Sequence, residues 1–201
     1  MDFSNIVKGQ VAQSLVKTIF ETGGYRVSRL GVEEVFKEVT HLEYRQYQAL
    51  KLPLALRTLP DFLVATPDID KAWLLEVKFR SNFDNDTITE LHETLSKQFN
   101  YWDDAVAVIL IGTHPCEEKS GKFIQDYMRV ITKDSLNELI KPRDIHRAPS
   151  YLLSKGYILY ENYWVWDSLK QPHHFFSGLH AEKVLKKADT MIKTLKSLVN
   201  N

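Results

Sequence analysis

Three charged residues, Asp61, Glu76 and Lys78, lie in or directly beside two short apolar segments in the first half of this 201-residue chain. The first segment, Phe62–Ala65, follows directly after Asp61. The second segment, Ala72–Lys78, contains Glu76 and ends at Lys78. Both have the length and apolar content of β-strands, and the residues between them include a proline and two aspartates, which favour a turn. The sequence therefore predicts a β-hairpin that carries charge into an apolar core.

Such a hairpin would bring the three charges together. Glu76 and Lys78 are two residues apart, so their side chains project from the same face of a strand. Asp61 converges on them if it lies at the start of the adjacent strand. Two convergent carboxylates are oxygen ligands that suit Mg²⁺ or Mn²⁺, and a metal held in this way stabilises phosphoryl charge and activates water. Lys78 then has three candidate roles: orienting water, stabilising the pentacoordinate phosphorus, or acting as a general base.

Periodic patterns on both sides of the hairpin predict the fold class. Apolar residues recur at helical spacing in Ile6–Thr22 and in Thr87–Trp102. Tyr25–Leu30 alternates as a half-buried strand does, the stretch 33–50 is less regular and partly helical, and Ala105–Ile111 is a buried strand. A helix between two such strands implies a crossover connection. We therefore expect an α/β fold in the order αβββαβ, with a mixed central sheet flanked by helices.

The chain is predicted to be one domain of 1–201, with a core at 6–112 and a C-terminal elaboration of strands and helices at 113–201. Four elements are predicted in the elaboration: a strand at Tyr127–Thr132, a short helix at Lys133–Ile140, an aromatic strand or hairpin at Tyr157–Trp166, and an amphipathic helix from Ala181.

Composition narrows the setting of the protein. With 26 basic and 26 acidic residues the formal net charge is zero, so bulk charge does not call for a polyanionic partner and any nucleic-acid surface must be local. The single cysteine, Cys116, cannot form an internal disulfide, and the start of the chain has no signal-peptide pattern. No apolar run approaches the roughly 20 residues that span a bilayer. We expect a cytoplasmic protein with no membrane role.

The hairpin residues also resemble a known signature. Pro60-Asp61 followed by Glu76-Val77-Lys78 is similar to the bipartite pattern of the PD-(D/E)xK nuclease superfamily, the restriction-endonuclease-like fold, whose core has the order αβββαβ. The resemblance covers roughly residues 6–112. Within it, Lys8-Gly9-Gln10-Val11-Ala12-Gln13 is similar to the first helix of archaeal Holliday-junction resolvases.

The resemblance implies an activity and a set of site residues. Asp61, Glu76 and the main-chain carbonyl of Val77 would hold Mg²⁺ or Mn²⁺, and Lys78 would serve catalysis beside Asp61 and Glu76. The expected activity is that of a Mg²⁺-dependent deoxyribonuclease that hydrolyses phosphodiester bonds of DNA.

One position departs from the family pattern. The resolvases carry a metal-binding glutamate where this chain has Gln13, a neutral side chain. The site would then have one negative charge fewer and would bind metal more weakly or bind a single ion. Glu33, Glu34 and Glu38 are candidates for replacing the missing carboxylate.

Five further residues are candidates around the site. Gln98 and Tyr101 are similar to the glutamine and tyrosine of some exonuclease branches of the superfamily, although they are three residues apart here rather than four. Arg80, Arg26 and Arg29 flank the predicted strands and are candidate contacts for phosphates.

Two other functions remain open from the sequence. The chain could be a catalytically inactive member of the fold that binds nucleic acid or a protein, with Gln13 as a sign of decay. It could also be an interaction module that exposes the aromatic segment 157–166. The residues do not separate DNA from RNA, endonuclease from exonuclease, one sequence or structure specificity from another, or restriction from repair or mobile-element roles. A homodimer is also open, since many members of the superfamily dimerise.

Overall fold

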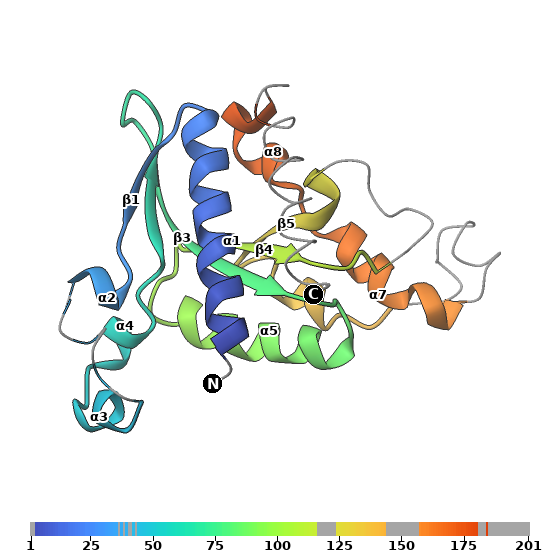
Figure 1. Cartoon of the computed structure of the whole chain (residues 1–201). Coiled ribbons are helices and arrows are strands. Elements are labelled where there is room, and N and C mark those ends of the chain that lie inside the picture. The colour runs from blue at the N-terminus through green and yellow to red at the C-terminus, as the bar shows by residue number, and fades with distance from the viewer. Residues whose placement is uncertain are drawn as a thin grey trace.

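A mixed β-sheet lies at the centre of the protein (Figure 1). The computed structural model describes residues 3–35, 37, 39, 42, 44–115, 124–143, 157–180 and 184. Within these residues the sheet has five strands: β1 (Arg26–Arg29), β2 (Phe62–Ala65), β3 (Ala72–Arg80), β4 (Val106–Ile111) and β5 (Met128–Thr132). They lie side by side in the order β1-β2-β3-β4-β5, and only the β3–β4 pair among them is parallel.

Helices pack around this sheet. Those that the structure describes include the α-helices α1 (Phe3–Thr22), α2 (Val32–Val35), α3 (Tyr44–Ala49), α4 (Leu54–Arg57), α5 (Asn85–Phe99), α7 (Tyr157–Ser168) and α8 (Pro172–Phe175). They also include the 3₁₀ turns η3 (Ile124–Tyr127), η4 (Leu136–Leu139) and η6 (Ser177–His180). No helix among the described residues combines the length and apolar character needed to cross a membrane.

The predicted hairpin and crossover are both present. β2 and β3 pair antiparallel with Phe62 opposite Leu75, so Asp61 lies directly before the paired region. β3, α5 and β4 form the crossover, with β3 and β4 parallel and Lys78 beside Ile109. Apart from three short helices between β1 and β2, namely α2, α3 and the unpredicted α4, the elements from α1 to β4 follow the predicted order α-β-β-β-α-β.

α5 begins at Asn85, two residues before the prediction, and ends at Phe99, three residues before it. The start is fixed by Asp84, whose carboxylate accepts a hydrogen bond from the backbone N–H of Thr87 at 2.8 Å. That hydrogen bond lowers the pKa of Asp84 below its ordinary value. An aspartate at this position also complements the positive end of the helix dipole.

The prediction of a strand or hairpin at Tyr157–Trp166 is wrong, because this segment forms α7. Tyrosine, tryptophan and valine favour strands, but that preference depends on the surface against which they pack. Here Tyr163 and Trp166 are three residues apart and both are buried, as the inner side of a helix requires. The predicted helix at Lys133–Ile140 is reduced to the 3₁₀ turn η4, and the predicted helix from Ala181 lies almost wholly outside the described residues.

Arg129 ties α7 to the sheet. Its Nε donates to the carbonyl of Trp166 at 2.9 Å, its Nη1 donates to the carbonyl of Met128 at 2.8 Å, and its guanidinium lies 4.8 Å from the centre of the Trp166 ring. The indole N–H of Trp166 in turn donates to the carbonyl of Asp126. Burial lowers the pKa of Arg129 to about 10, which leaves the guanidinium charged at neutral pH.

The C-terminal elaboration also packs against the first helix. Phe176 is fully buried, and its ring makes edge contacts with Phe20 of α1 at 4.7 Å and with Trp73 of β3 at 5.2 Å between ring centres. The backbone N–H of Gly178 donates to the hydroxyl of Tyr25 at 3.1 Å. Buried residues from both predicted parts of the chain, from Ala12 to Val184, thus share one hydrophobic core.

We predict that Phe176→Ala lowers the free energy of unfolding by about 3–5 kcal/mol, because it leaves a cavity between α1 and β3. Phe175→Ala is the matched control: Phe175 is only partly buried, so its truncation should cost less. Urea unfolding followed by circular dichroism measures both. Equal losses for the two variants would contradict the described packing.

Candidate active site

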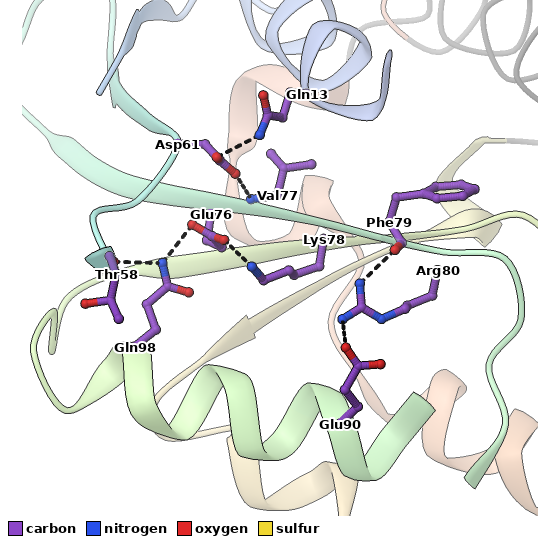
Figure 2. Close-up of polar contacts among 10 residues, drawn as sticks. All are labelled: Gln13, Thr58, Asp61, Glu76, Val77, Lys78, Phe79, Arg80, Glu90 and Gln98. Carbon is purple, nitrogen blue, oxygen red and sulfur yellow. Dashed lines mark hydrogen bonds and ion pairs between the residues drawn. The ribbon is translucent and has the colours of Figure 1, made fainter. Parts of the chain in front are cut away.

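Glu76 and Lys78 lie together on one face of β3, as predicted. Glu76 is 6% exposed, and the side chain of Lys78 is 23% exposed. The ammonium Nζ of Lys78 donates to Oε1 of Glu76 at 2.5 Å. The intervening Val77 is buried on the opposite face. The strand therefore presents a paired carboxylate and ammonium on the side where α5 packs (Figure 2).

Gln98 holds the second oxygen of Glu76. It lies on α5 and is 4% exposed, because it belongs to the same buried stripe as Leu91 and Leu95. Its Nε2 donates to Oε2 of Glu76 at 2.7 Å and to the main-chain carbonyl of Thr58 at 3.2 Å. Both oxygens of this buried carboxylate are thus hydrogen-bonded, one from the same strand and one from the facing helix.

Asp61 binds the edge of β3 at the point where β2 stops pairing with it. The backbone N–H of Val77 would face an empty edge there, and Oδ2 of Asp61 accepts its hydrogen bond at 2.8 Å. Oδ1 of Asp61 accepts from Nε2 of Gln13 on α1, also at 2.8 Å. In an antiparallel ladder the N–H and C=O of one residue point to the same neighbouring strand, so the carbonyl of Val77 faces the edge occupied by Asp61.

These contacts join α1, β3, α5 and the residue before β2 into one cluster, which we call the β3 cluster: Gln13, Asp61, Glu76, Val77, Lys78 and Gln98. Figure 2 shows α1 on one side of β3 and α5 on the other, each contributing a glutamine. Val77 links the two halves because it lies between Glu76 and Lys78 and its amide binds Asp61. The structure thus brings together the residues proposed from the sequence for metal binding and catalysis.

Other candidates lie apart from the β3 cluster. Tyr101 follows the end of α5 and is 48% exposed, and none of the hydrogen bonds of the described residues joins its side chain to the cluster. Arg26 and Arg29 lie exposed on the edge strand β1. Glu34, a candidate for replacing the missing carboxylate, pairs with Arg29 at 3.6 Å. The side chains of Glu33 and Glu38 lie outside the described residues.

Arg80 lies at the end of β3, two residues beyond Lys78 and on the same face. Its Nη2 donates to Oε1 of Glu90 on α5 at 2.8 Å, and its Nη1 donates to the carbonyl of Phe79 at 2.8 Å. The sequence pointed to Arg80 but not to Glu90 or Thr58. No sequence pattern indicates these two residues. Thr58 contributes only its main-chain carbonyl, and Glu90 is one of several exposed acidic residues on a helix.

Comparison with known proteins gives no family model, no curated relative and no solved structure that matches this chain.

The donor atoms of the β3 cluster can be tested against a metal. No group of three or more histidine, cysteine, aspartate or glutamate side chains capable of holding an ion occurs among the described residues. The cluster instead offers two carboxylates, from Asp61 and Glu76, and the carbonyl of Val77. This all-oxygen set fits a hard cation such as Mg²⁺, which usually binds one or two carboxylates and keeps several waters or phosphate oxygens.

Removal of the Gln98 amide should show how strongly the fold depends on pairing the buried charge. We predict that Gln98→Leu lowers the free energy of unfolding by about 1–3 kcal/mol, because Oε2 of Glu76 loses its buried donor. In a Glu76→Gln background the same substitution should cost less, since a neutral amide is less costly to leave unpaired. Chemical unfolding of the four proteins gives the coupling between the two positions. Additive effects would argue against a direct bond.

The alternative function as an interaction module requires an exposed aromatic surface on segment 157–166. The described side chains of that segment do not provide one, since Tyr163, Val165 and Trp166 are each 5% exposed or less. Trp166 packs against Phe83 and Arg129, so the described part of the segment gives this alternative no support.

Proposed function

We propose that this protein is a metal-dependent nuclease of the PD-(D/E)xK type that hydrolyses phosphodiester bonds of DNA. The observation that carries the proposal is the β3 cluster, in which Asp61 binds the amide between Glu76 and Lys78. The restriction-endonuclease-like core is part of the same proposal. It is supported by the α-β-β-β-α-β order of α1, β1, β2, β3, α5 and β4 and by the parallel β3–β4 pair on which the cluster lies.

The proposed roles follow from the chemistry of each group. Asp61, Glu76 and the carbonyl of Val77 would hold Mg²⁺ or Mn²⁺, which supplies Lewis-acid stabilisation of phosphoryl charge and an activated water when bound. Lys78 places an ammonium group beside Glu76, where it stabilises negative charge on phosphorus and orients water. Gln98 and Gln13 act as positioning residues, since each donates to one carboxylate oxygen and restricts its orientation.

A second candidate is an inactive domain of the same fold that binds nucleic acid or a protein partner. It is favoured by one observation: each of the four carboxylate oxygens of Asp61 and Glu76 already accepts a hydrogen bond from an N–H group. On this reading the cluster is a structural polar network. A neutral residue at Gln13 also agrees with it, because fewer carboxylates attract a cation less strongly.

An activity assay separates the two candidates. Linear, nicked, single-stranded and branched DNA, with RNA for comparison, would be incubated with wild-type protein in Mg²⁺, Mn²⁺ or chelator. We predict metal-dependent cleavage that falls by about 100-fold or more in Lys78→Ala, because the variant lacks the ammonium at the reacting phosphate. Lys133→Ala is the matched control, because Lys133 also pairs with an acidic residue, Asp103, and neither residue belongs to the β3 cluster.

Titration calorimetry with Mg²⁺ and Mn²⁺ accompanies the assay. A heat of binding that disappears in Asp61→Asn would support the proposed ligands. If no substrate is cleaved in either metal and no metal binds, the nuclease proposal fails and the inactive domain replaces it.

Gln13→Glu tests the metal site without an activity readout. The new carboxylate would lie within hydrogen-bond distance of Asp61, so without metal we predict that the melting temperature falls by roughly 2–8 °C through repulsion and a lost hydrogen bond. Adding Mg²⁺ should raise the melting temperature of this variant more than that of wild type, since bound cation stabilises the folded state. Gln10→Glu, on the exposed side of α1, is the control for added charge. Identical responses to Mg²⁺ in both variants would count against a cation at Asp61.

A further inference from the structure

The ion pair of Arg80 and Glu90 lies on the same face as the β3 cluster, and the guanidinium of Arg80 is incompletely bonded (Figure 2). We propose that Glu90 occupies the position of a substrate phosphate, and that Arg80 binds the phosphate next to the cleaved one when Glu90 is displaced. The inference rests on the proposed function and names a specific backbone contact of its substrate.

The hydrogen bonds of Arg80 show which side of its guanidinium is available. Nη1 donates a hydrogen bond to the main-chain carbonyl of Phe79. The opposite edge, formed by Nε and Nη2, is the one that binds planar or tetrahedral anions through two parallel hydrogen bonds. Nη2 donates to one oxygen of Glu90, whereas Nε is buried and has no hydrogen-bond partner among the residues that the structure describes. A carboxylate thus fills only half of a two-donor edge.

A buried donor without an acceptor is unfavourable, and an anion that accepts from both Nε and Nη2 removes that deficit. Phosphate is well suited, because its oxygens match the fork of an arginine side chain. Glu90 is easily displaced: its side chain is 62% exposed, and exposed ion pairs contribute little to stability. The geometry therefore favours exchange of the carboxylate for a phosphate.

The position of Arg80 on β3 fits a backbone contact. Lys78 and Arg80 are two residues apart on an extended strand, so their Cα atoms are separated by roughly 7 Å. Along one nucleic-acid strand every nucleotide carries a negatively charged phosphate, so the strand presents a row of closely spaced anionic groups. With Lys78 at the reacting phosphate, Arg80 on the same face of β3 would lie beside an adjacent phosphate of the same strand. Until a strand arrives, Glu90 neutralises Arg80 and lowers the attraction of this surface for anions in general.

Binding measurements in chelator test the proposal without cleavage. The probe is a short fluorescein-labelled DNA duplex and its separate strand, followed by fluorescence anisotropy at several salt concentrations. Glu90→Gln should tighten binding by about two- to fivefold, because it removes a weak competitor for Arg80. Arg80→Ala should weaken binding and reduce the slope of log K against log salt by about 0.7–0.9, the value for one phosphate contact.

The double variant and a matched control decide the cause. In the Arg80→Ala background, Glu90→Gln should no longer tighten binding, since its effect acts through Arg80. Asp103→Asn removes the acidic partner of another exposed ion pair, with Lys133, and changes the net charge equally. It should leave affinity nearly unchanged.

An equal gain in Glu90→Gln and Asp103→Asn, or a gain that persists without Arg80, would overturn the inference. Cleavage of DNA by wild type together with either result would overturn the phosphate contact alone and leave the nuclease standing. An Arg80-dependent gain in a protein that cleaves nothing would support the contact while the nuclease proposal fails.

Discussion

The buried charge of Glu76 sets conditions that the surrounding structure must meet. An unpaired carboxylate in the interior of a sheet costs on the order of several kcal/mol, so its partners have to be in place when the chain folds. Lys78 meets one condition through strand geometry alone, because residues two apart share a face. Gln98 can donate to the second oxygen of Glu76 only if α5 packs on β3 in one register. The placement of the crossover helix is therefore tied to a single side chain.

Much of the core could be predicted because its signals are local. Alternation and periodicity gave the hairpin, the first helix and α5 to within three residues at each end. The convergence of Asp61 with Glu76 and Lys78 also followed from the strand period once the hairpin was assumed. Gln98 and Tyr101 are both candidates from the resemblance, although their spacing departs from it. Only Gln98 reaches the cluster, since α5 ends at Phe99 and Tyr101 lies beyond its buried stripe.

The features that escaped prediction depend on contacts between distant segments. α7 has the composition of a strand, and it is helical where Trp166 packs against Arg129 and Phe83. Thr58 contributes through a main-chain carbonyl, which any residue type provides. The partnership of Arg80 with Glu90 requires the angle at which α5 leaves β3, and a sequence gives no direct measure of that angle.

The contact of Phe176 with Phe20 and Trp73 has a consequence for the order of folding during synthesis. Every residue of the β3 cluster precedes Phe176 in the chain and therefore leaves the ribosome before it. Phe20 on the first helix nevertheless lacks its contact with Phe176 until a segment some 150 residues further along the chain has been synthesised. Closing so long a loop delays this contact. A nascent chain would therefore hold all of the proposed catalytic groups before the core that fixes them is complete. The segment that carries Phe176 thus determines when the elements that precede it become a stable scaffold.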